Sequence, residues 1–157
     1  MKTVSLKELK TEISTLSHPQ MLDLCMHLAK YKKENKELLS YLLFEAHDEQ
    51  SFIEKVKALA IEQFSDINKS NLYLTKKTIR KILRTINKYI KYSGIKQTEV
   101  ELLIFFCQQF KNASIPVYPN TALGNIYLRQ ILKINKALAS LHEDLQYDYS
   151  VEIKDLI

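Results

Sequence analysis

Apolar residues recur along most of the chain at the three- and four-residue spacing that places side chains on one face of an α-helix. The pattern predicts about seven helices, whose apolar stripes we expect to face a common core. Short polar segments separate them. In chain order, we expect helices over residues 5–16, 19–31, 35–44, 48–64, 75–93, 98–110 and 121–142.

Residues with strong positional preferences mark where several of these helices begin and end. Ser5 and Glu8 have the spacing of a capping box, in which each side chain bonds a free backbone N–H of the first turn. Pro19 suits the first turn of the second helix, where its missing N–H costs nothing. We expect Thr75 to cap the fifth helix, Gly94 to end it, and Thr98 to open a second capping box.

The composition favours a purely helical fold. The 157 residues include two glycines and three prolines, whereas β-rich proteins need many turns built from these residues. The segment LLIFFC at 102–107 is apolar on more than one face of its helix, which indicates a central, buried element. Because short connections favour antiparallel neighbours, we predict helical hairpins arranged like a short α-α superhelix, with a closed helical bundle as the alternative.

No linker-like segment divides the sequence, so we predict a single all-helical domain over residues 1–157. Residues 143–157 form an acidic tail with five acids and one lysine. We expect this tail to be partly ordered. Its apolar residues available to dock a short final element are Val151, Ile153, Leu156 and Ile157.

Positive charge is concentrated in one segment. The net charge is +5, yet residues 67–98 hold nine basic residues and no acid, while the remainder holds 14 basic and 18 acidic residues. On a helical wheel of the fifth helix, the basic residues occupy one side and the apolar residues the other. The candidate anion- or partner-binding residues on this basic face are Lys76, Lys77, Arg80, Lys81, Arg84, Lys88 and Lys91.

Several interpretations of this basic face stay open. It fits the solvated side of an ordinary surface helix, because lysine is a good helix former and its aliphatic stem covers apolar neighbours. Two features favour a bound anion instead. Seven like charges repel one another, and Lys76 and Lys77 fall in the expected first turn, where the helix dipole disfavours cations. The candidate anions are nucleic acid, an acidic protein, the chain's own acidic tail and a membrane surface.

The sequence contains no recognisable catalytic or cofactor motif. Gly94 and Gly124 cannot form a phosphate-binding loop or a dinucleotide fingerprint, and no Gly-x-Ser-x-Gly turn occurs. No histidine has a metal-ligand spacing, and Cys25 and His27 would diverge by about 200° around a helix. We therefore expect no catalytic residue, no cofactor and no metal. An enzyme would require a deep cleft that contains buried titratable side chains.

The remaining sequence features indicate a cytoplasmic protein. Cys25 and Cys107 each lie in an apolar run, and we expect both to be buried, reduced thiols. The first ten residues lack the apolar core of a signal peptide. The longest apolar run has six residues, far short of the roughly 18–20 needed to span a membrane.

Three stretches share a wider pattern: SLKELKTEISTLSHPQMLDLCMHLA, EQFSDINKSNLYLTKKTIRKILRTINKYIK and ELLIFFCQQF. Together they resemble the first two helices, the basic connector with its basic helix, and the apolar central helix of a bacterial all-helical family of unknown function. The resemblance covers most of the chain. It implies a small helical domain of the bacterial cytoplasm and brings no catalytic residues.

We predict a non-enzymatic helical interaction module that docks a protein partner or self-associates, with the basic face as its positive docking surface. The alternative is a nucleic-acid-binding protein that contacts phosphates through the basic helix at 75–93. The two hypotheses differ in their response to salt. Binding through several phosphates weakens steeply as salt rises, whereas an interface with an apolar centre does not.

Overall fold

The computed structural model describes residues 3–156, and this part of the chain is built from α-helices and contains no strand. The prediction of an all-helical fold with paired helices is confirmed. The chain divides into two compact units, Met1–Phe44 and Glu45–Ile157, and each is described by itself. The single domain expected over residues 1–157 stays a prediction.

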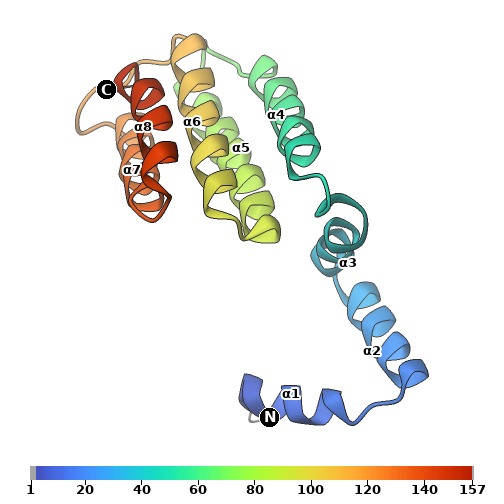
Figure 1. The fold of residues 1–157 in the computed structure, drawn as a ribbon. Helices are drawn as coiled ribbons and strands as arrows, with labels where there is room; N and C mark the ends of the chain where they lie inside the picture. The colour runs from blue at the N-terminus through green and yellow to red at the C-terminus, as the bar shows by residue number, and fades with distance from the viewer. Residues whose placement is uncertain (1–2, 157) are drawn as a thin grey trace. The chain divides into compact units, whose positions relative to one another are not determined.

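The first unit consists of short helices (blue in Figure 1). Both capping signals near its start are present: Ser5 and Glu8 form the predicted capping box, and Ser17 and Gln20 form a second one with Pro19 in the first turn. The helix expected to run on to residue 44 changes after Ser40 into a π-helical segment, Tyr41–Glu45. The α-helices of this unit are α1 (Leu6–Ser14), α2 (His18–Tyr31) and α3 (Lys33–Ser40).

The apolar stripes of α1 and α2 form as predicted, but the expectation that they face a core is wrong. Leu6 is 84% exposed, Leu22 56% and Leu28 51%. The physical reason is size. A unit of three short helices offers too little chain to build a second layer over every apolar stripe.

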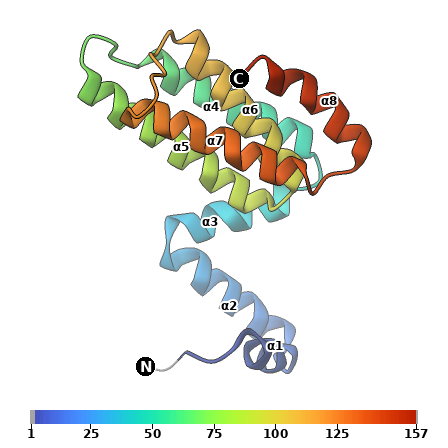
Figure 2. The same ribbon diagram turned by 90° about the vertical axis from the view of Figure 1, so that its left-hand side faces the viewer.

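The second unit contains two helical hairpins and a final helix (Figures 1 and 2). Helix α4 pairs with α5, and α6 pairs with α7. Helix α6 also packs on both α4 and α5, and α8 packs on α7. This pairing of adjacent helices confirms the helical hairpins predicted from the sequence. The bounds are α4 (Glu49–Ser65), α5 (Leu72–Ser93), α6 (Lys96–Asn112), α7 (Ala122–Leu138) and α8 (Glu143–Lys154).

The central position predicted for the LLIFFC helix is confirmed, because α6 supplies most of the fully buried side chains of this unit. Its aromatic rings connect the layers. The Phe106 ring lies 5.7 Å from that of Phe64 on α4 and 5.9 Å from that of Phe110, which in turn lies 5.4 Å from the ring of Tyr127 on α7. The contacts of Phe110 with Phe106 and with Tyr127 are edge-to-face, a geometry that adds stability beyond the area buried.

Two predicted helix caps are wrong. Helix α5 begins a turn earlier than expected, capped by Asn71, whose side chain accepts hydrogen bonds from the backbone N–H groups of Tyr73 and Leu74. Thr75 is a buried residue inside the helix, and its hydroxyl donates to the carbonyls of Asn68 and Asn71. The glycine stop was predicted correctly: Gly94 has φ 68°, a left-handed conformation that glycine adopts without strain.

The second wrong cap is Thr98. Helix α6 starts at Lys96, after Ile95, which forms no side-chain cap. Thr98 is buried within the first turn, and its hydroxyl donates to the carboxylate of Glu49 on α4 at 2.6 Å. The threonine therefore joins two helices rather than capping one.

The C-terminal part of the chain is more ordered than the sequence suggested. Helix α7 ends at Leu138, not at His142, and most of the acidic tail forms α8. Of the residues expected to dock, Ile153 and Leu156 are buried whereas Val151 is 56% exposed. Ile157 lies outside the described residues.

Candidate interaction surfaces

Helix α5 carries the basic face predicted from the sequence. The isoleucines at 79, 82, 86 and 90 are buried in the core of the second unit, to which α5 belongs. The seven predicted binding residues lie on the opposite side of the same helix. Five of them are exposed, and Lys76 and Lys88 are half-buried. The full set is Lys76, Lys77, Arg80, Lys81, Arg84, Lys88 and Lys91.

These cations have few internal counter-charges. Apart from Lys88, none of the seven has a carboxylate within 4.0 Å among residues 3–156. Two of the seven amines contact aromatic rings: the Lys76 amine lies 5.9 Å from the Tyr73 ring centre, and the Lys88 amine lies 4.8 Å from that of Tyr89. The face is therefore a row of like charges that an external anion would stabilise.

The prediction that Lys76 and Lys77 lie in the first turn of α5 is wrong. Because α5 begins at Leu72, Lys76 and Lys77 lie beyond its first turn, where the helix dipole has little effect. The side chain of Asn71 already occupies two of the free N–H groups at the helix start. The helix start therefore adds nothing to the basic face, and only its side chains are available to an anion.

Helix α7 extends the basic face. The Lys133 amine donates to the side-chain carbonyl of Asn87 on α5 at 3.2 Å, which places this side of α7 against the basic side of α5. Arg129 and Lys136 share that side of α7, since they lie four residues before and three residues after Lys133. We call the seven cations of α5 and these three of α7 the basic surface.

The acidic tail does not neutralise the basic surface. Helix α8 lies on α7, and its carboxylates bond elsewhere: Glu152 accepts from Gln108, and Asp144 lies 3.3 Å from His142. Among the described residues, no α8 carboxylate pairs with a cation of the basic surface. This geometry gives no support to the hypothesis that the tail is the anion.

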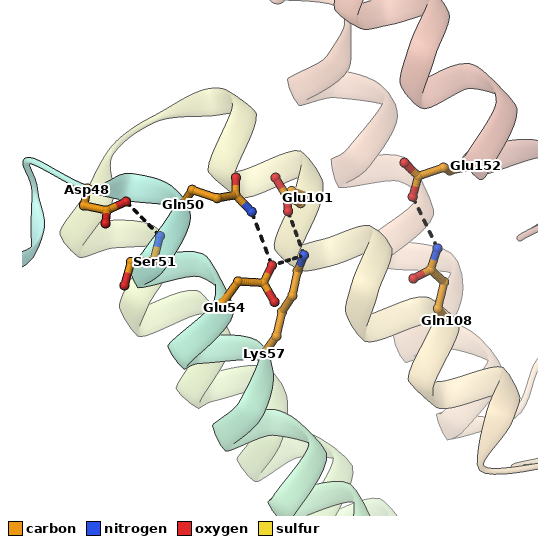
Figure 3. A network of polar contacts seen from close by, with 8 residues as sticks. All are labelled: Asp48, Gln50, Ser51, Glu54, Lys57, Glu101, Gln108 and Glu152. Carbon is orange, nitrogen blue, oxygen red and sulfur yellow. Dashed lines mark hydrogen bonds and ion pairs between the residues drawn. The ribbon is translucent and has the colours of Figure 1, made fainter.

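A polar cluster joins α4 to α6 (Figure 3). The Lys57 amine lies 2.9 Å from a carboxylate oxygen of Glu54 and 2.7 Å from one of Glu101. Burial acts to lower the pKa of Lys57, but the hydrogen bonds and charges of Glu101 and Glu54 outweigh it and raise the pKa. Lys57 therefore stays protonated at neutral pH.

The same cluster lines a small pocket of about 260 Å³. Tyr149 from α8 reaches it, and burial raises the pKa of this phenol. Lys57 is thus an ammonium that bridges a carboxylate on its own helix to one on α6, and Tyr149 is a neutral phenol beside it. We interpret the cluster as a structural tie between helices.

A second pocket, of about 320 Å³, lies where the proline-containing loop meets α7. Gly124 permits this approach, since a Cβ at that position would lie 2.0 Å from the carbonyl oxygen of Tyr118. Tyr127 fixes the far side by donating its hydroxyl to the carbonyl of Leu156 at 2.9 Å. Burial and the neighbouring Cys107 raise the pKa of Tyr127 to about 12, so it remains a donor.

A third pocket lies wholly within the first unit, between α2, α3 and the start of the π-helical segment. It is a groove of about 570 Å³ lined by apolar side chains and by lysines, and we call the apolar lining residues its floor and the lysines its rim. The sequence pattern gave no sign of it, because the groove depends on the angle between two helices.

Both cysteines are free; Cys107 is buried as predicted, whereas Cys25 is only half-buried. Burial raises the pKa of Cys107 to about 12, although Lys111 opposes the shift, and such a thiol is unreactive. Within the described residues, no three His, Cys, Asp or Glu side chains converge as metal ligands do. No helix over residues 3–156 has both the length and the apolar character needed to span a membrane.

Comparison of the chain with protein-family models, with curated proteins and with solved structures found no match.

Proposed function

We propose that this protein is a non-enzymatic helical interaction module that docks a protein partner or a second copy of itself. The observation that carries the proposal is the exposure of the apolar stripes in the first unit. Leu6 and Leu9 on α1 and Leu22 and Met26 on α2 are all more than 40% exposed.

The energetic reason is the hydrophobic effect. Covering one leucine or methionine side chain stabilises a complex by about 1.5–3 kcal/mol when burial is complete. Several apolar side chains in register on one helix are typical of a surface that another helix covers. An isolated exposed leucine needs no explanation, but a stripe at helical spacing favours docking.

Photo-cross-linking in cells that express the chain tests this proposal. A photoreactive amino acid is placed at Leu9 or at Leu22, and in matched controls at the exposed polar neighbours Lys10 and Asp23. We expect discrete adducts from the two leucine positions and much weaker ones from the controls. Sedimentation velocity over a range of concentrations shows whether the partner is a second copy. A chain that stays monomeric and yields no adduct above the controls contradicts the proposal.

A second candidate function is nucleic-acid binding, which the basic surface favours. A surface rich in lysine and without an apolar centre differs from a stable protein interface, whose core is depleted of lysine. It suits a phosphate backbone, which binds any such array of cations without reading sequence. An acidic protein would meet the same cations, so the response to salt must separate the two.

Fluorescence anisotropy with labelled duplex and single-stranded nucleic acids at about 50 and 200 mM salt provides that test. The comparison variant replaces Arg80, Lys81, Arg84 and Lys91 with glutamine. For nucleic-acid binding we expect affinity to fall by orders of magnitude with salt and to be lost in the variant. No binding by the wild-type chain at either salt concentration would reject this second function.

A further inference from the structure

The groove of the first unit is preformed by a short, well-defined connection. A single extended residue, Lys32, separates α2 from α3, with φ −141° and ψ 145°. The side-chain amide of Asn35 then donates to the carbonyl of Leu28 at 2.8 Å, which fastens the start of α3 to the last turns of α2. These two features fix the angle between the helices, so the groove does not depend on a ligand to form.

The floor of the groove is apolar and remains accessible. It is lined by Met26 and Ala29 of α2, by Leu39 of α3, and by Leu43 and Phe44 of the π-helical segment. Leu43 is 62% exposed and Phe44 69%. Helix α3 forms one wall of the groove, and its eight residues give that wall a length of about 12 Å, or two helical turns. A groove of these dimensions matches the apolar face of a helix with anchors at positions i, i+4 and i+7.

The rim of the groove is positive. Lys30, Lys32, Lys33 and Lys36 line it, and no carboxylate does. Lys33 lies 3.7 Å from Glu37. Lys30 and Lys36 have no carboxylate partner among the described residues. Lys32 lies 5.9 Å from the ring centre of Tyr31. An occupant with acids on both sides of its apolar stripe would therefore pair with this rim.

We propose that the groove docks an acidic amphipathic helix of a partner protein, with three apolar anchors on its floor and carboxylates against its lysines. The inference rests on the proposed function and names the site and the chemistry of the partner. Helix α8 of a second copy fits less well. Its outward side offers two apolar anchors, Tyr147 and Val151, and the next turn presents Lys154 and Asp155.

The test uses the full chain and three labelled peptides in anisotropy titrations. The first is a synthetic helix of about 16 residues with leucines at i, i+4 and i+7 and glutamates beside them. The second has lysine in place of every glutamate. The third has the sequence of α8. We expect the acidic peptide to bind at least about tenfold more tightly than the basic one, because like charges at the rim are repulsive.

Protein variants locate the binding. The rim variant Lys30→Glu, Lys32→Glu, Lys36→Glu should reverse the preference, so that the basic peptide binds more tightly. The matched control Lys77→Glu, Lys81→Glu, Lys91→Glu changes the net charge equally on α5 and should keep the preference for the acidic peptide. The floor variant Leu43→Ser, Phe44→Ser should weaken binding of the acidic peptide about tenfold or more. Both floor residues are exposed, so the chain should stay folded, which circular dichroism checks.

Several results would overturn the proposal: equal binding of the acidic and basic peptides, the same reversal in the α5 control, or no binding of the acidic peptide. Tighter binding of the α8 peptide than of the designed acidic helix would assign the groove to a second copy instead. If the peptide titrations give one of these results but cross-linking at Leu9 and Leu22 succeeds, the module docks its partner through a surface other than the groove. Failure of both experiments would reject the proposed function itself.

Discussion

The basic surface makes a quantitative prediction about α7, which the sequence did not single out. If nucleic acid binds across both helices, replacing Arg129, Lys133 and Lys136 with glutamine removes up to three phosphate contacts. Each contact contributes about 0.9 to the slope of log affinity against log salt for duplex DNA. Ten cations set a limit of about −9 for this slope, and the seven of α5 alone set a limit of about −6.

The difference is large enough to measure. When salt rises from about 50 to 200 mM, each phosphate contact contributes a factor of about 3.5 to the loss of affinity. Without three contacts, the loss of affinity is therefore about 40-fold smaller. The assay is duplex binding by fluorescence anisotropy at four or more salt concentrations. The control variant replaces Lys7, Lys10 and Lys30 of the first unit with glutamine, which changes the net charge by the same amount.

Two outcomes would refute the reasoning. An unchanged slope in the α7 variant would show that the bound duplex touches α5 without reaching the neighbouring helix. An equal change in the control would show that net charge alone governs binding, and the contact between Lys133 and Asn87 would then have no bearing on it.

Three further predictions concern the second unit, and urea denaturation measures each. Lys57→Met should lower the free energy of unfolding by about 1–3 kcal/mol at neutral pH. Because the pKa of Lys57 is raised by folding, its contribution is present below the unfolded-state value and should fade as pH rises through the folded-state value. Gly124→Ala should destabilise by about 1–3 kcal/mol despite alanine's better helix propensity, since the new Cβ meets the carbonyl of Tyr118; an increase in stability would contradict this contact. Asn71→Ala should cost about 1 kcal/mol, and no loss would argue against its role as the cap of α5.

Periodicity predicted which side of α5 faces inward, and the reason is local. Ile79, Ile82 and Ile86 repeat at three and four residues, and all three are fully buried. The same pattern placed the cations outward. A helix of this length with one apolar stripe has one stable orientation against a core, so the sequence was sufficient there.

Helix starts were predicted less well, because the preferred cap residues also serve other purposes. Threonine often caps helices, yet the hydroxyls of Thr75 and Thr98 bond elsewhere. The Thr75 hydroxyl donates to the backbone carbonyl of Asn68, and the Thr98 hydroxyl donates to a carboxylate on another helix. The partner of Thr98 is Glu49, which is 49 positions away. A contact between residues so far apart in the chain cannot be read from the local sequence. Asn71, by contrast, is a preferred cap residue just before the apolar pattern of α5, which is a local signal for the helix start.

The sequence alone predicts neither the extension of the basic surface onto α7 nor the exposure of the apolar stripes in the first unit, and the reasons are physical. Arg129, Lys133 and Lys136 have helical spacing that a wheel of α7 would show, but their position beside α5 follows from packing. In the first unit, periodicity indicates which face of each helix is apolar. It does not indicate whether other residues of the unit cover that face. A stripe looks the same in sequence whether it faces a core or a partner.

The charge pattern of α5 is costly for folding alone. Like charges four residues apart occur at 76/80, 77/81, 80/84 and 84/88. Each such pair destabilises a helix by about 0.2–0.5 kcal/mol, so the four together cost roughly 1–2 kcal/mol. Proteins of this size are stable by about 5–15 kcal/mol, and glutamates at alternate turns would turn this cost into a gain. A sequence shaped by stability alone would interleave acids along this face. Pairing with the anion of the second proposed function would offset this cost.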